Sequence, residues 1–67
     1  MELTIDCEIE DDGRCIAEIA QLPGVMAYGA TAAEACVRAE ILALRVLADR
    51  LEHGEAKPVD IKILVPA

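Results

Sequence analysis

The first ten positions of the chain alternate between apolar and polar side chains. A period of two is typical of a β-strand that buries one face and exposes the other to water. The apolar side of this predicted strand consists of Leu3, Ile5, Cys7 and Ile9. The polar side consists of Glu2, Thr4, Asp6, Glu8 and Glu10. We therefore expect residues 2–10 to form a half-buried strand.

A turn signal, Asp-Asp-Gly at residues 11–13, follows this strand. The next apolar residues share a sheet face with the first strand only if the loop has three residues, because a two-residue loop would mix the faces. Gly13 then takes the left-handed position of the loop. The predicted register pairs Glu10 with Arg14, Ile9 with Cys15, Cys7 with Ala17, and Ile5 with Ile19.

The middle of the chain contains a second break, a short apolar run and a helix start. Gln21–Gly24 ends the second strand, because Pro-Gly is a strong turn signal. Val25–Gly29 is too short for a helix and predicts a brief third strand. Thr31 and Glu34 fit a capping box, in which the hydroxyl and the carboxylate satisfy each other's backbone donors. We expect the helix to run from Thr31 to about His53.

The end of the chain contains a helix stop and another alternating segment. Gly54 and Pro58 follow the predicted helix, and Val59–Val65 alternates like a strand. A helix that returns across the sheet places this last strand parallel to the third and beside the first. The sequence predicts one α+β domain over residues 1–67, with order β-β-β-α-β. Its mixed sheet has strand order 3-2-1-4, with one helix packed on one face.

The composition excludes several classes of protein. The chain is 55% hydrophobic with a net charge of -7, and Tyr28 is its one aromatic residue. Six scattered Lys and Arg residues and no stacking platform argue against direct nucleic-acid binding. No stretch approaches the roughly 18 to 20 apolar residues of a membrane span. The acidic first ten residues differ from a secretory signal, so we expect a cytoplasmic protein without membrane contact.

Three cysteines, Cys7, Cys15 and Cys36, are spaced without a CxxC pair. An odd number in this spacing argues against a disulfide framework and against a zinc finger. Free cysteine is among the most frequently buried residue types. We expect all three to be small apolar core residues in a reducing compartment.

One long stretch resembles a known family. Residues 11–35, DDGRCIAEIAQLPGVMAYGATAAEA, followed by an alanine-rich helix and a last strand, resemble the N-terminal domain of HicB antitoxins and their short single-domain relatives. The resemblance lies in the combination of DG-R-x-I-A-E, LPG, a following glycine and T-x-x-E-A, and it covers nearly the whole chain. It implies a partial ribonuclease-H-like fold. It also implies binding and neutralisation of a HicA-like toxin, a small basic ribonuclease that cleaves messenger RNA.

The chain departs from that family in two respects. HicB proteins usually add a C-terminal DNA-binding segment, whereas this sequence ends with VPA after the last predicted strand, so we expect no DNA-binding domain. In relatives the outer helix face is commonly polar. Here that face carries Val37, Ile41 and Leu44.

At 3.6 residues per turn the predicted helix has two apolar faces. The expected core face consists of Ala35, Cys36, Ala39, Leu42, Ala43, Val46 and Leu47. The second face, called the outer stripe below, consists of Val37, Ile41, Leu44, Ala48 and Leu51. A polar strip of Glu34, Arg38, Arg45, Asp49 and Glu52 lies beside the outer stripe.

The spacing of the outer stripe, 4-3-4-3, is typical of a helix that pairs with another helix. We therefore expect the protein to be a homo-oligomer that uses the outer stripe. Two alternatives are a HicA-like partner on the stripe and a tilted helix that buries both faces within one monomer. Other candidate partner surfaces are the outer sheet face and the exposed edge of the third strand, whose backbone groups are unpaired. The edge consists of Val25, Met26, Ala27 and Tyr28.

Candidate catalytic residues are few. In the predicted register Asp6 lies opposite Glu18, with Glu8 nearby, and paired carboxylates can bind Mg²⁺. Alternating acids on the wet side of a sheet are more often a solvated face, which Lys62 could partly neutralise. The chain has no serine and no glycine-rich phosphate loop, and His53 is placed to cap the helix.

We therefore predict no catalytic, cofactor-binding or metal-binding residue, and a non-enzymatic HicB-like antitoxin that binds itself and a HicA-like toxin. One alternative is an orphan self-assembling module without a toxin. A second is a metal-dependent hydrolase that uses Asp6, Glu8 and Glu18.

Overall fold

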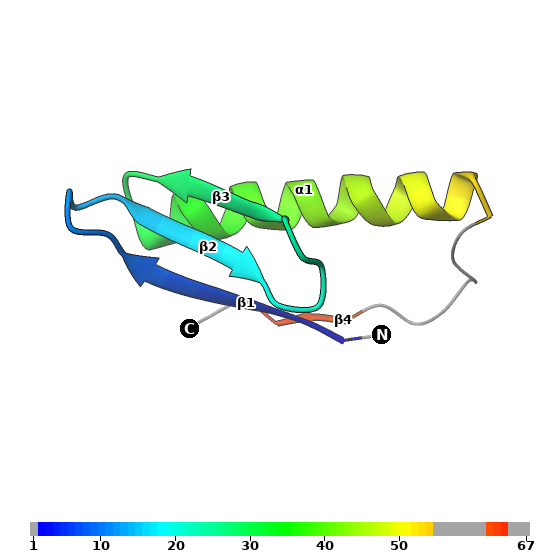
Figure 1. The fold of residues 1–67 in the computed structure, drawn as a ribbon, viewed down its shortest axis with the longest axis horizontal. Coiled ribbons are helices and arrows are strands. Elements are labelled where there is room, and N and C mark those ends of the chain that lie inside the picture. Colours follow the sequence, from blue (N-terminus) through cyan, green and yellow to red (C-terminus); the bar gives the residue numbers. More distant parts are fainter. Residues whose placement is uncertain (1, 55–61, 65–67) are drawn as a thin grey trace.

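The computed structural model describes residues 2–54 and 62–64, which form one helix on one face of a sheet (Figure 1). The elements are β1 (Glu2–Ile9), β2 (Cys15–Ile19), β3 (Met26–Gly29), α1 (Ala32–Glu52) and β4 (Lys62–Leu64). Sheet order is β3-β2-β1-β4, with β4 parallel to β1 and the other pairs antiparallel. The predicted α+β fold and strand order are confirmed. Residues 59–61 and 65 of the predicted last strand lie outside the described residues.

The β1–β2 hairpin has the register that the apolar pattern predicts. Ile5 pairs with Ile19, Cys7 with Ala17, and Ile9 with Cys15. The Glu10 N–H donates to the Arg14 carbonyl at 2.7 Å, and Gly13 has a φ of 89°, the left-handed conformation that favours glycine. The Arg14 N–H donates to the Asp12 carboxylate, which lowers the pKa of Asp12 below its ordinary value. Local hydrogen bonds therefore hold the three-residue loop.

The loop between β2 and β3 is tied to the sheet by two residues. Leu22 is buried in the core although it lies in a turn. The Gln21 side chain accepts a hydrogen bond from the Thr4 N–H at 3.0 Å and donates one to Thr4 Oγ1 at 3.4 Å. The Gln21 amide thus binds β1 one residue beyond Ile5, at the end of the β1–β2 ladder.

Helix α1 is capped by Thr31 at its N-terminus and by His53 at its C-terminus. The Thr31 hydroxyl accepts a hydrogen bond from the Glu34 N–H at 3.1 Å, as the capping pattern predicts. The Glu34 carboxylate instead forms an ion pair with Arg38 at 2.6 Å, so the described residues contain the hydroxyl half of the capping box. At the other end the His53 N–H donates to the Asp49 carbonyl, and Gly54 follows with a φ of 69°.

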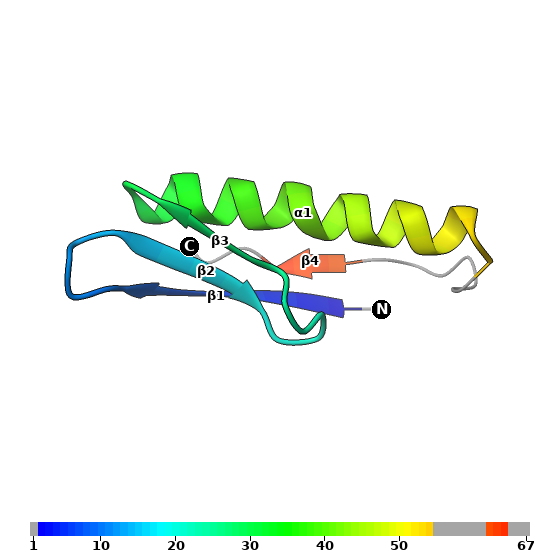
Figure 2. The same cartoon turned by 45° about the horizontal axis from the view of Figure 1, so that its top comes forward.

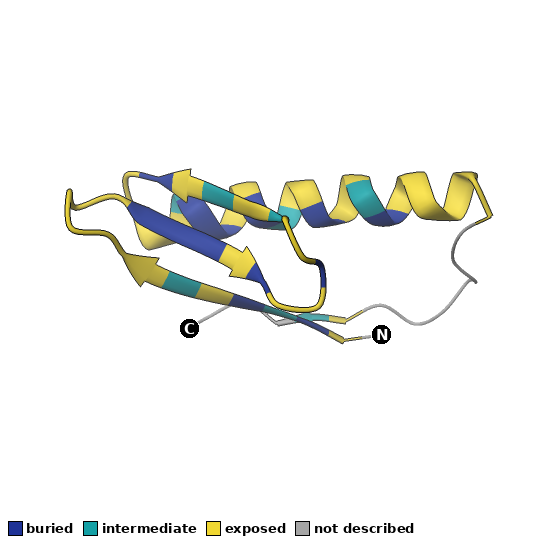
Figure 3. Cartoon of the chain, in the orientation of Figure 1, coloured by how far each residue is buried: buried dark blue, intermediate teal, exposed yellow. Residues whose placement is uncertain are grey.

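The core lies between α1 and the inner sheet face (Figures 2 and 3). From the helix it includes Ala35, Cys36, Ala39, Ala43 and Leu47. Small residues let the helix axis approach the sheet closely. A Cβ added at Gly29 would lie 2.6 Å from the Ala35 backbone nitrogen, so the third strand also needs a residue without a side chain at this point.

Several residues of the predicted core are less buried than expected, among them Cys7, which is half-buried. Ile9 is 77% exposed, because the β1–β2 turn lies beyond the N-terminal end of α1 in Figure 1. Leu42 is exposed and Val46 is half-buried, because both lie toward the rim of the helix face that contacts the sheet. The width of the buried helix face was therefore overestimated.

Candidate functional site

The outer stripe of α1 is exposed along its whole length. Val37, Ile41, Leu44 and Leu51 are between 41% and 55% exposed, and Ala48 is also exposed. At 100° per residue the centre of the stripe lies roughly 140° around the helix from the centre of the buried face. These exposures contradict the alternative in which a tilted helix buries both apolar faces within one monomer, because one helix cannot turn both toward a single sheet.

Charged side chains lie along one side of the outer stripe. Arg38 is held by two contacts, an ion pair from Nη2 to Glu34 and a hydrogen bond of 3.0 Å from Nη1 to the Tyr28 carbonyl. Arg45 follows Arg38 about two turns later, and beyond it the charge changes sign at Asp49 and Glu52. His53 Nδ1 lies 3.2 Å from Asp49 Oδ1. Along the polar strip an acidic residue, Glu34, therefore precedes the two arginines, and two acidic residues follow them.

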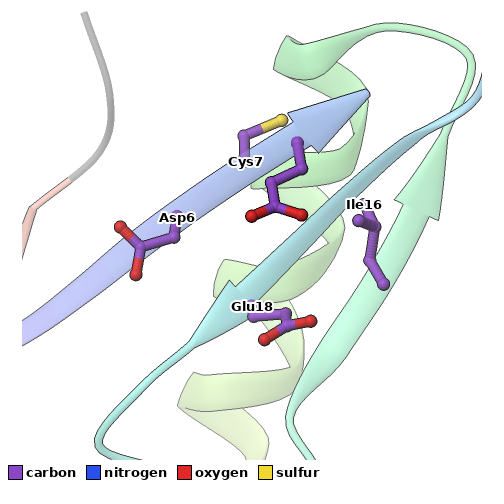
Figure 4. A pocket seen from close by; sticks show the side chains of 5 residues that line it. Asp6, Cys7, Ile16 and Glu18 are labelled. Atoms are coloured by element: carbon purple, nitrogen blue, oxygen red, sulfur yellow. The ribbon is translucent and has the colours of Figure 1, made fainter. Parts of the chain in front are cut away.

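The outer face of the sheet is a second exposed surface, called the acidic sheet face below. Asp6 pairs with Glu18 and Glu8 with Ile16 in the β1–β2 register, as predicted for the carboxylates. A hollow of about 320 Å³ lies there, lined by Asp6, Cys7, Glu8, Ile16 and Glu18. Figure 4 shows the Asp6 and Glu18 carboxylates pointing away from each other. They do not converge on a common point as metal ligands would.

Ile16 is the residue of this face that the sequence interpretation missed. It is only 7% exposed although it lies on the side of the sheet away from the helix. Its cross-strand neighbours are Glu8 on β1 and Tyr28 on β3, so it lies between these two side chains in the sheet. The sequence signal that could have identified it is an isoleucine at a position of the second strand where the alternation predicts a polar residue. The acidic sheet face therefore has an apolar floor.

Lys62 does not neutralise the centre of the acidic sheet face. It pairs with Glu2 in the β1–β4 register, at the opposite end of β1 from Glu8. The cation nearest the hairpin end is Arg14, whose guanidinium carbon lies 4.7 Å from the centre of the Tyr28 ring and whose Nε is 2.7 Å from Asp12. The Asp6, Glu8 and Glu18 side chains are themselves exposed to solvent.

The edge of β3, predicted as a candidate partner surface, is partly occupied. The Ile19 N–H donates to the Val25 carbonyl at 3.1 Å, so by alternation Met26 and Tyr28 turn their backbone groups away from β2. Arg38 donates to the Tyr28 carbonyl. Val25 itself lies just before β3 and is half-buried. Of the backbone groups that Met26 and Tyr28 turn to the open edge, the Tyr28 carbonyl is therefore already bound by Arg38.

The three cysteines form one thiol cluster between the sheet and the helix. Cys15 and Cys36 are buried and Cys7 is half-buried, and all three are free thiols. Burial raises the pKa of the Cys7 thiol above its ordinary value, and the neighbouring Cys36 thiol raises it further. Burial and the neighbouring Cys7 do the same to the pKa of Cys15. Protonated thiols of this kind are weak nucleophiles, because the thiolate is the reactive form.

Within residues 2–54 and 62–64, no group of three or more His, Cys, Asp and Glu side chains is arranged to hold a metal ion. In the same part of the chain, no helix combines the length and the apolar character needed to cross a membrane. Comparison of the chain with protein-family models, with curated proteins and with solved structures gave no match.

Proposed function

We propose that this chain is a non-enzymatic, HicB-like antitoxin-type protein that binds and neutralises a HicA-like, mRNA-cleaving toxin. The observation that carries the proposal is the acidic sheet face, where Asp6, Glu8 and Glu18 surround the apolar floor at Ile16. The resemblance of residues 11–35 to HicB antitoxins supplies the class of partner, a small basic protein. We also place the protein in the cytoplasm, where its free thiols stay reduced.

The acidic sheet face has the chemistry that a basic protein surface requires. Lys and Arg side chains of a partner can extend their charged groups to the exposed carboxylates of Asp6, Glu8 and Glu18. Hydrogen bonds between a guanidinium and a carboxylate are stronger than those between neutral groups. The net charge of -7 also speeds the encounter with a basic partner and suppresses acidic ones.

The test is co-expression with the small basic protein of about 60 to 80 residues that a HicA-like toxin gene beside this one would encode, a length typical of one small domain. We expect the two proteins to copurify and the growth arrest caused by the toxin to be relieved. Glu18→Lys should weaken binding about tenfold or more, because it places like charges in contact at the interface.

Asp11→Lys is the matched control, because Asp11 is an exposed turn residue outside the acidic sheet face. Each substitution changes the net charge equally, from -7 to -5. We expect less than a twofold loss for Asp11→Lys. Equal losses for the two variants would show that only net charge matters, and failure to copurify would contradict the proposal itself.

An orphan module that self-assembles without a toxin is the second candidate. The exposed outer stripe favours it, because an apolar surface of this spacing is suited to a helix partner whether or not a toxin exists. Copurification separates the two candidates, since an orphan module would not bind the neighbouring protein.

A further inference from the structure

We infer that two copies of this chain form a two-fold symmetric dimer in which the outer stripes of two antiparallel α1 helices pack against each other. This inference does not rest on the proposed toxin binding, because it involves the helix face opposite the sheet. It commits to a second copy of the chain as the occupant of the outer stripe.

The outer stripe is nearly symmetric about its centre. Leu44 lies seven residues from both Val37 and Leu51, and Ile41 and Ala48 lie three and four residues to either side. A two-fold axis beside Leu44 therefore places Val37 opposite Leu51 of the second copy, and the large Ile41 near the small Ala48. A surface that matches itself after a two-fold rotation is the requirement for an isologous dimer.

The ends of the polar strip are complementary to each other in the same arrangement, whereas Arg45 lies beside the axis next to its own copy. Arg38 lies six residues before Leu44, whereas Asp49 and Glu52 lie five and eight residues after it. The two-fold axis brings Arg38 of one copy beside the acidic pair of the other, and this happens twice per dimer. The contacts of Arg38 with Glu34 and Tyr28 already orient the guanidinium, whose five N–H donors leave some free for another carboxylate.

The antiparallel arrangement is also favoured by the helix dipoles. In an antiparallel pair the partly positive N-terminus of each helix lies beside the partly negative C-terminus of the other. The outer stripe from residue 37 to residue 51 is about 21 Å long, at 1.5 Å per residue. The sheets lie on the outer sides of the helix pair, so both acidic sheet faces remain open.

The first test is the molar mass of the purified full-length chain by light scattering over a range of concentrations. We expect the mass to rise from that of a monomer to that of a dimer. Leu44→Asp should keep the mass at the monomer value, because a charge would have to be buried in the seam. Circular dichroism should show the same helix content for this variant as for wild type, since Leu44 is half exposed in one copy.

Ile9→Asp is the matched control. Ile9 is also an exposed, large apolar residue, but it lies on the hairpin away from the outer stripe. We expect it to dimerise like wild type. A wild-type chain that stays monomeric at every concentration, or a Leu44→Asp variant that still dimerises, would overturn the inference.

The orientation is tested by charge exchange. Arg38→Glu and Glu52→Arg should each weaken dimerisation several-fold, because each places like charges opposite one another. The double variant Arg38→Glu/Glu52→Arg should restore it, because the exchanged charges attract again. A double variant that is weaker than both single variants would overturn the antiparallel arrangement.

These tests also distinguish the dimer from the proposed function. Leu44→Asp should lower the molar mass to that of a monomer and still bind the toxin. Glu18→Lys should remain a dimer and bind the toxin more weakly. A monomeric wild type whose toxin binding is lost in Leu44→Asp would assign the outer stripe to the toxin and overturn the inference.

Discussion

The two apolar faces of α1 differ in the size of their residues more than in their hydrophobicity. The buried face is mostly small, with Ala35, Ala39 and Ala43 along the line of closest approach to the sheet. The outer stripe has Ile41 and Leu44 at its centre, and both are exposed. In this helix the smaller residues mark the face that packs on the sheet, because a sheet with Gly29 at the contact leaves no room for larger ones. The larger residues remain available for a partner.

The comparison is tested most directly by the same truncation on each face. Leu47 is 4% exposed and Leu51 is 41% exposed, one helical turn apart. Leu47→Ala should lower the free energy of unfolding by about 3 kcal/mol, because it leaves a cavity in the core. Leu51→Ala should lower it by well under about 1 kcal/mol in dilute monomer, as expected for a surface site. Urea unfolding followed by circular dichroism measures both, and equal losses would contradict the division into two faces.

A second test enlarges one alanine on each face. Ala39 is fully buried, so Ala39→Leu should force the helix from the sheet and cost about 2 kcal/mol, as overpacking usually does. Ala48→Leu adds the same atoms to the outer stripe, where they meet solvent in a monomer. It should leave the unfolding midpoint of the dilute chain unchanged. An Ala39→Leu variant as stable as wild type would show that the close approach of helix and sheet is not required.

The smallest expected effect on stability comes from two of the three thiols that lie between the buried helix face and the sheet, those of Cys7 and Cys15. Their raised pKa values mean that the folded state favours the protonated form more than the unfolded chain does. The resulting stability is complete below the ordinary thiol pKa of 9.0 and is lost as the pH rises through the higher folded-state values. The urea midpoint should therefore fall between pH 8 and pH 10.5.

Cys7→Ala is the control for that titration, because Cys7 contributes its own shift and part of the shift of Cys15. The variant should show a smaller fall in midpoint over the same pH range, while other groups titrate equally in both proteins. An identical fall in the two proteins would mean that the thiol cluster does not affect stability.

The hairpin was the most predictable part of the fold. Sheet faces alternate strictly, so the requirement that Cys15 and Ala17 share a face with Ile9 leaves one loop length and one register. The helix start was predictable for a similar reason, because the Thr31 hydroxyl satisfies a donor three residues on. Both depend on neighbours in the sequence.

The burial of residues at the edges of the core was less predictable, because it depends on how far one element extends over another. Ile9 alternates correctly but lies beyond the end of the helix. Ile16 has a polar-face position and is buried, with Glu8 and Tyr28 as its neighbours on the adjacent strands. Gln21 binds Thr4 through an amide that no periodicity marks. Each of these three features depends on how the elements lie against one another in space, and the spacing of residues in the sequence does not specify that.

The candidate surfaces divide in the same way. The outer stripe followed from 4-3-4-3 spacing, and its exposure agrees with that pattern. The thiol cluster could have been found by combining the hairpin register with the helix face, since Cys7 and Cys15 are diagonal neighbours on the inner side of the sheet and Cys36 lies on the buried helix face. The contact of Arg38 with the β3 edge could not have been found from the sequence, because a long side chain makes it between two separate elements.

The parallel pairing of β4 with β1 has a consequence for the order of folding. It joins Glu2 to Lys62, positions 60 residues apart (62 minus 2), whereas the β1–β2 turn closes a loop of three. Loop-closure entropy grows with the logarithm of length, so the terminal pairing costs roughly 2 to 3 kcal/mol more than the hairpin. The meander and helix can therefore assemble while the chain emerges from the ribosome. The edge of β1 that pairs with β4 stays open until residues 62–64 have been synthesised.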